Sequence, residues 1–138
     1  MTHTPQQHDS HPMRSVLLGV VIVASTCGAY IPAMQAGFVW DDDHLITHNR
    51  FIHDPQGIWR VWMTTDTPDY FPLTSSLFWL QWRLWGDDPT GYHVVNIALH
   101  ALAAVLVWRV IRALHIPGAF LAAMLFALHP VNVASVAW

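Results

Sequence analysis

The feature that most constrains this chain is an uncharged run of twenty residues from Ser15 to Met34. As an α-helix that rises about 1.5 Å per residue, the run reaches about 30 Å, the thickness of the hydrocarbon core of a bilayer. A cleaved signal peptide is the alternative, but its apolar part usually has only ~7–15 residues. We therefore predict a retained transmembrane helix at residues 15–34.

Two further apolar stretches follow, at residues 93–114 and 118–138. Charged residues make up only 11% of the chain, about half the usual share in a globular protein. We therefore predict an all-α, multi-pass integral membrane protein with three transmembrane helices, the third truncated where the sequence stops. The polar residues 1–14 predict a disordered cytoplasmic tail, although its three histidines leave metal binding open.

Residues 35–92, between the first two predicted helices, have a different character. They carry eight Asp against three Arg, and they contain six of the eight Trp. Pro72 suits the first turn of a helix, so residues 73–85 predict an apolar, amphipathic helix at the headgroup level, where Trp is common. A buried soluble helix is the alternative, but so short a loop has little protein to bury it.

The arginines indicate the orientation in the membrane. Arg14, Arg109 and Arg112 flank the predicted helices on one side, and the acidic loop lies on the other. By the positive-inside rule, the amino terminus is cytoplasmic and residues 35–92 lie outside; in a bacterium the membrane would be the inner one. Membrane lipid is thus a partner, whereas the net charge of -3 and the lack of a basic cluster exclude nucleic acid.

An acidic motif follows the first predicted helix, namely Asp41, Asp42 and Asp43 with His44. Adjacent carboxylates suit a general base or a metal ligand, and a plain solvated turn is the alternative. Consecutive residues rarely all point at one ion, so we predict no tight metal site and no firm cofactor, although a divalent cation is possible.

Polar residues inside the predicted spans are the second group of candidates. His93, Asn96 and His100 share one helix face at i, i+3 and i+7. Counted along the helices, His100 and His129 lie at similar depths, roughly 10 and 14 Å below the outer surface. Such residues point to function, and ordinary interhelical hydrogen bonds are the alternative. Pro130 predicts a kink beside His129.

Read in order, these residues resemble one family. The shared motifs are Phe38–Asp42, Asn49, Pro72–Thr74, Tyr92–His93 with Asn96 and His100, Leu128–Asn132 and Ser135–Trp138. They are similar to the amino-terminal membrane part of the transmembrane and tetratricopeptide-repeat glycosyltransferases, which are related to protein O-mannosyltransferases. This chain departs from that family at Phe71, where many relatives are basic, and at Ala134, where several have Glu. The further helices and repeats of the family do not follow.

The resemblance implies a partial glycosyltransferase C-type fold, a polyprenyl-phosphate-linked sugar donor and an acceptor hydroxyl on a protein. It also implies an active site on the non-cytoplasmic side, with Asp41 or Asp42 as the catalytic base. The local candidates for binding the donor are Arg50, Arg83, His93, Asn96, His100 and His129. The 138 residues alone are expected to be inactive, because the later helices would complete the donor pocket.

Two other classes of protein stay open at this point. One is a non-catalytic membrane module whose Trp-rich segment docks on lipid or on a partner protein. The other is a metal-handling membrane protein that uses residues 41–44.

Overall fold

The computed structural model describes residues 11–67 and 69–137, and within them the regular elements are all helical. The predicted all-α class is therefore confirmed for the described part of the chain. Residues 1–10 of the tail predicted at residues 1–14 lie outside the described residues. The described chain divides into two compact units, which are residues 11–29 with 98–132, and residues 30–67 and 69–97 with 133–137.

The first apolar run forms α1 (His11–Tyr30), which continues as a 3₁₀ helix, η1 (Ile31–Gln35). Residues Pro12–Gln35 are long and apolar enough to cross a membrane. The helix begins four residues before the predicted position, so the prediction of a disordered tail is wrong for residues 11–14. Pro12 fits the first turn because an N–H there would have no partner in the helix. Met13 and Arg14 are good helix formers.

The second apolar stretch forms α5 (Pro89–Ala113), which is also long and apolar enough to span a membrane. It begins ahead of the predicted residue 93 because the side chain before it caps the first turn. Oδ1 of Asp88 accepts a hydrogen bond from the backbone N of Thr90 at 3.0 Å. A carboxylate in that place satisfies one of the N–H groups that a helix start leaves unpaired.

The third stretch does not form the single helix predicted at residues 118–138. It is divided into α6 (Ala119–Leu128), a 3₁₀ turn η3 (Pro130–Asn132) and α7 (Val133–Val136), with a bend of 47° at the break. Ten residues of α6 rise only about 15 Å, half of a bilayer core. Pro130 lacks the N–H that would continue the helix, so the kink predicted beside His129 is confirmed.

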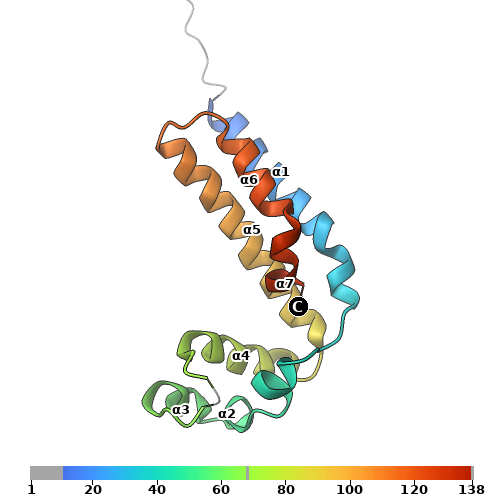
Figure 1. Cartoon of the computed structure of the whole chain (residues 1–138), viewed down its shortest axis with the longest axis vertical. Helices are drawn as coiled ribbons and strands as arrows, with labels where there is room; N and C mark the ends of the chain where they lie inside the picture. Colours follow the sequence, from blue (N-terminus) through green and yellow to red (C-terminus); the bar gives the residue numbers. More distant parts are fainter. Residues whose placement is uncertain (1–10, 68, 138) are drawn as a thin grey trace, which may run out of the picture. The chain divides into compact units, whose positions relative to one another are not determined.

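In the unit that holds residues 98–132, α1, α5 and α6 run side by side (Figure 1). The helices meet around a buried apolar cluster of Ile22, Ala104, Trp108, Ala123 and Ala127. The three alanines are fully buried, and small residues are common where membrane helices pack.

The other unit contains the predicted acidic loop, and most of that loop is helical. Its elements are the π-helical turn η2 (Asp43–Thr47), α2 (Arg50–His53), α3 (Gly57–Met63) and α4 (Pro72–Trp85). The helix predicted at residues 73–85 is confirmed, with Pro72 as its first residue.

Helix α4 packs against α2, α3 and η2. Nε1 of Trp79 donates to the backbone oxygen of Asp54 at 2.8 Å, and the ring of Trp82 stacks on His53 at 4.0 Å. Nε1 of Trp62 donates to Oγ of Ser76 at 2.9 Å. The tryptophans thus pack α4 along one side, but Gln81 is the one buried residue of this helix, as expected for a loop with little protein to cover it. Its place at the membrane surface stays a prediction.

Candidate active site

Asp42 closes the acidic turn with its own side chain. Its Oδ2 accepts a hydrogen bond from the backbone N of Val39 at 2.9 Å, and its backbone N donates to the oxygen of Val39 at 3.2 Å. Between them, Trp40 has a φ of 51° and is 78% exposed. A bulky residue rarely adopts this left-handed conformation, so the turn needs the bonds that Asp42 makes.

Asp41 and Asp43 have different surroundings. Oδ1 of Asp43 accepts a hydrogen bond from Oγ1 of Thr47 at 2.9 Å, which ties that carboxylate to its own π-helical turn. The backbone oxygen of Asp41 accepts from Leu45 at 2.8 Å, but within residues 11–67 and 69–137 its exposed carboxylate has no hydrogen-bond or ion-pair partner. Of the three carboxylates, that of Asp41 is the one left open to a substrate.

The segment before this turn is anchored to the first two turns of α5. Nε2 of His93 donates to the backbone oxygen of Ala36 at 3.1 Å, and the ring of Phe38 meets Tyr92 edge-on at 5.2 Å. The hydroxyl of Tyr92 donates to the oxygen of Gly86 at 3.0 Å. His93 is only 4% exposed. His93 thus supports the acidic motif, because its hydrogen bond fixes the backbone segment that leads into Asp41.

The segment after the turn is held by Asn49. Its Oδ1 accepts from the backbone N of Phe51 at 3.0 Å and caps α2, while its Nδ2 donates to the oxygen of Leu45 at 3.1 Å. The next residue, Arg50, is exposed and its guanidinium lies 4.8 Å from the ring centre of Phe51. Arg50 is therefore a cation placed shortly after the acidic turn in the chain, with its charge accessible.

Arg83 is held more firmly than Arg50. Its Nη2 donates to the backbone oxygen of His53 at 3.0 Å, and its guanidinium lies 4.8 Å from the ring centre of Trp79. The hydrogen bond joins α4 to the end of α2, whereas the contact with Trp79 lies within α4. Arg83 thus stabilises the packing of α4, and its remaining N–H groups are available to bind an anion.

His100, His129 and Asn132 surround the break in the third stretch. Pro130 cannot donate to the oxygen of Phe126, and Nδ2 of Asn132 replaces that bond at 2.7 Å. The backbone N of Val131 turns to Nδ1 of His129 at 3.1 Å.

The oxygen of Ala127 instead accepts from Nε2 of His100 at 3.0 Å. For His100 this is the interhelical hydrogen bond that the sequence left as an alternative. His129 is exposed, and its ring bonds to the backbone of its own turn.

The structure thus places Asp41, Asp42, Asn49, Arg50, Arg83 and His93 in one unit and His100 and His129 in the other. Asn96, half-buried, lies one turn beyond His93 on α5 and makes no side-chain hydrogen bond to any described residue. Within residues 11–67 and 69–137, no three His, Cys, Asp or Glu side chains converge as a metal site.

The sequence analysis missed Gln81. This side chain is 2% exposed, and neither its amide N nor its amide O has a partner among the described residues. Buried amides without partners are costly, and they are uncommon in native proteins. The signal was present, because Gln81 is the one amide side chain in α4 and its neighbours Leu80 and Trp82 are apolar and aromatic.

Comparison with known proteins shows what the chain is similar to. The chain is 28% identical to a protein O-mannosyl-transferase of Caenorhabditis elegans over 133 residues, 86% of this chain and 19% of that protein. It is 32% identical to protein O-mannosyl-transferase TMTC2 of Mus musculus over 84% of this chain and 16% of that protein. For protein O-mannosyl-transferase Tmtc1 of Drosophila melanogaster, the identity is 31% over 98% of this chain and 18% of the relative.

The chain is a relative of the protein O-mannosyl-transferases. The resemblance seen in the motifs is thereby confirmed. The chain spans less than a fifth of the length of these three relatives. No family model matches it, and no solved structure matches it.

Proposed function

We propose that this chain carries the acceptor-activating part of a membrane glycosyltransferase, with the carboxylate of Asp41 as the catalytic base. The observation that carries the proposal is that the three carboxylates of the acidic turn differ in their hydrogen bonding. The carboxylate of Asp42 accepts from the backbone N of Val39 and that of Asp43 from the hydroxyl of Thr47, whereas the exposed carboxylate of Asp41 has no partner among the described residues. The kinship with protein O-mannosyl-transferases supports glycosyl transfer as the reaction.

In the proposed reaction, Asp41 takes the proton of an acceptor hydroxyl as that oxygen forms a bond to the anomeric carbon of the donor sugar. The bond from the anomeric carbon to the phosphate oxygen breaks, and polyprenyl phosphate leaves with the electron pair. A base placed in this way is typically worth ~10²–10⁴-fold in rate.

The leaving phosphate gains negative charge and needs donors that are already in place. Arg50 is the best candidate in this unit, because it is exposed and its guanidinium makes only a contact with an aromatic ring. Arg83 can contribute the N–H groups that His53 does not use. His93 and Asn96 would contribute to donor binding near the start of α5. His100 and His129 would contribute by stabilising the break between α6 and α7.

We place the reaction on the non-cytoplasmic side of the membrane. The arginines that flank the apolar helices support this orientation, since Arg14, Arg109 and Arg112 belong on the cytoplasmic side. A lipid-linked donor is consistent with that side, because sugar nucleotides are made in the cytoplasm and a polyprenyl chain keeps the donor in the membrane. A protein hydroxyl is the proposed acceptor, after the names of the relatives.

The test of the reaction class is a donor comparison with the whole protein in membranes. Polyprenyl-phosphate mannose and a mannose nucleotide are supplied separately, and transfer to an acceptor peptide rich in Ser and Thr is measured by mass spectrometry. We expect transfer from the lipid-linked donor alone. Transfer from the nucleotide in membranes stripped of polyprenyl phosphate would contradict the proposed donor.

A further inference from the structure

The described part of one unit, residues 11–29 and 98–132, carries positive charge and contains no acidic residue. Arg14, Arg109 and Arg112 all lie there, and no Asp or Glu occurs in either range. Two of these arginines, Arg109 and Arg112, stand one turn apart at the end of α5. Arginines in this place favour an anionic partner, and residues 11–29 and 98–132 contain no carboxylate side chain to supply one.

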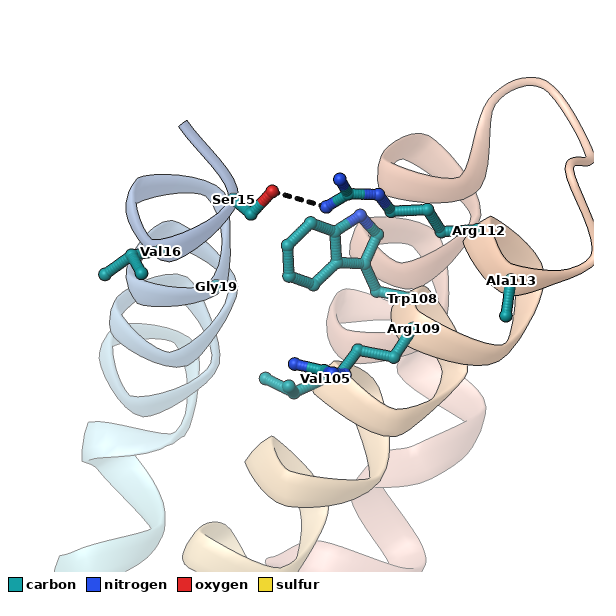
Figure 2. A pocket seen from close by; sticks show the side chains of 8 residues that line it. All are labelled: Ser15, Val16, Gly19, Val105, Trp108, Arg109, Arg112 and Ala113. Atoms are coloured by element: carbon teal, nitrogen blue, oxygen red, sulfur yellow. Dashed lines mark hydrogen bonds between the residues drawn. The ribbon is translucent and has the colours of Figure 1, made fainter. Parts of the chain in front are cut away.

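A cavity of about 560 Å³ opens between α1 and α5 beside these two arginines. It is lined by Ser15, Val16, Gly19, Val105, Trp108, Arg109, Arg112 and Ala113. Figure 2 shows the side chains of Arg109 and Arg112 extending from α5 toward α1, with the ring of Trp108 between them.

At the polar end of this cavity, the side chain of Arg112 is held in position by its neighbours. Nη1 of Arg112 donates to Oγ of Ser15, and the guanidinium lies 5.6 Å from the ring centre of Trp108. The indole of Trp108 is 5% exposed and belongs to the apolar cluster of this unit. Arg112 is thus held in place by two contacts, whereas Arg109 has no ion-pair or hydrogen-bond partner among the described residues.

An apolar groove continues from the cavity along α1. It has a volume of about 420 Å³ and is lined by Val16, Gly19, Val20, Val23, Ala24 and Val105. Three of these residues, Val16, Gly19 and Val105, also line the cavity, so the two spaces adjoin. Gly19 keeps the junction open, because it has no side chain to fill it.

We propose that this cavity and groove bind an anionic phospholipid. Its phosphate lies between Arg109, Arg112 and Ser15, and one acyl chain follows the groove of α1 toward the middle of the membrane. Basic pockets between membrane helices on the cytoplasmic side have the chemistry that such headgroups require. The apolar groove favours a lipid over a free phosphate, because a soluble anion has no apolar chain to pack against the valines. The site is separate from the acidic turn and does not depend on the proposed reaction.

Lipid binding by the whole protein tests this proposal. Native mass spectrometry compares phosphatidylglycerol with phosphatidylcholine of the same acyl chains, each with and without an excess of inorganic phosphate. We expect a preference for phosphatidylglycerol that inorganic phosphate does not remove. One arginine near a charged lipid surface is worth about fivefold in affinity, so Arg109→Gln with Arg112→Gln should lower the affinity for phosphatidylglycerol roughly thirtyfold. Arg60→Gln, an exposed position in the other unit, should leave it unchanged.

A second pair of variants tests the groove without altering charge. In Gly19→Leu the added side chain enters the groove, and its Cβ meets Trp108 at an ordinary distance of 3.5 Å. Gly28→Leu on the same helix has open space around its Cβ and serves as the control. We expect Gly19→Leu to lower the bound phosphatidylglycerol at least fivefold and Gly28→Leu to leave it unchanged. The proposal is overturned if the two lipids bind equally, if inorganic phosphate displaces phosphatidylglycerol, or if Gly19→Leu has no effect because another helix fills the groove.

Discussion

His100 donates a hydrogen bond from Nε2 to the backbone oxygen of Ala127, 3.0 Å away, and so joins α5 to the end of α6 where the third apolar stretch breaks. In an unbroken helix that oxygen would accept from the backbone N of Val131, which here turns to His129. The oxygen before it, on Phe126, has lost its donor to Pro130 and accepts from Asn132. The polar residues of this stretch thus replace the bonds that the proline removes.

A double-mutant cycle tests this replacement. Asn132→Ala should lower the free energy of unfolding by about 1 kcal/mol, because it leaves the oxygen of Phe126 unpaired. In a Pro130→Ala background the backbone N of Ala at position 130 can donate to that oxygen, so the same change should cost much less. Unfolding by denaturant in detergent micelles gives the four values. Equal costs in both backgrounds would contradict the account of the break.

Gly57 is expected to be intolerant of any side chain. A Cβ at this position would lie 1.7 Å from the backbone oxygen of Phe51, which cannot move without unfolding α2. Gly57→Ala should therefore destabilise the unit by about 3 kcal/mol or more. Gly37→Ala, with open space around its Cβ, is the matched control and should behave as wild type. Thermal unfolding followed by Trp fluorescence measures both, and a stable Gly57→Ala protein would show that α2 and α3 are arranged differently.

We expect the hydrogen bond with which Asp88 caps α5 to depend on pH. Hydrogen bonds from the side chain and then the backbone N of Thr90 lower the pKa of Asp88 below its ordinary value. A carboxyl whose pKa is lowered by folding stabilises the fold above its unfolded pKa of about 4, and that contribution is lost as the pH falls through the folded pKa. The protection factor of the Thr90 amide, which is its intrinsic exchange rate divided by the observed rate, should therefore fall at acidic pH in wild type. In Asp88→Asn, which stays neutral, the intrinsic pH dependence alone should remain.

The orientation in the membrane can be tested with one cysteine. Thr65→Cys is placed between α3 and α4 in a Cys27→Ser background, which removes the natural thiol. An impermeant thiol reagent should label it in intact cells, because the arginine bias predicts that this unit lies outside the cytoplasm. Labelling only after lysis would show that residue 65 faces the cytoplasm, and the proposed reaction would then have to take place on the cytoplasmic side.

The sequence predicts some of these features well because they depend on local physics. The spans at α1 and α5 follow from long runs without charge, and Pro72 marks the start of α4 as the first residue of a helix. The kink beside His129 follows from the missing N–H of Pro130. In each case the cause lies within a few residues of the effect.

Other features depend on partners far away in the chain. That Asp42 closes the turn while Asp41 stays open depends on the left-handed φ of Trp40, and no spacing rule foretells it. The packing of Trp79 on Asp54 and of Arg83 on His53 joins residues 25 and 30 positions apart. The burial of Gln81 likewise needs the fold of the whole unit, although an amide among aromatic residues was a visible sign.

The central claim, that Asp41 is the catalytic base, is tested most directly by comparing three Asp→Asn variants of the whole protein in the membrane transfer assay. Asp41→Asn should keep normal stability and KM but lower kcat by ~10²–10⁴-fold. Asp42→Asn should mainly lower stability, since its carboxylate closes the turn around Trp40, and its residual kcat should exceed that of Asp41→Asn. The exposed Asp87→Asn should match wild type. Wild-type turnover by Asp41→Asn, at a normal level of folded protein, would contradict the assignment.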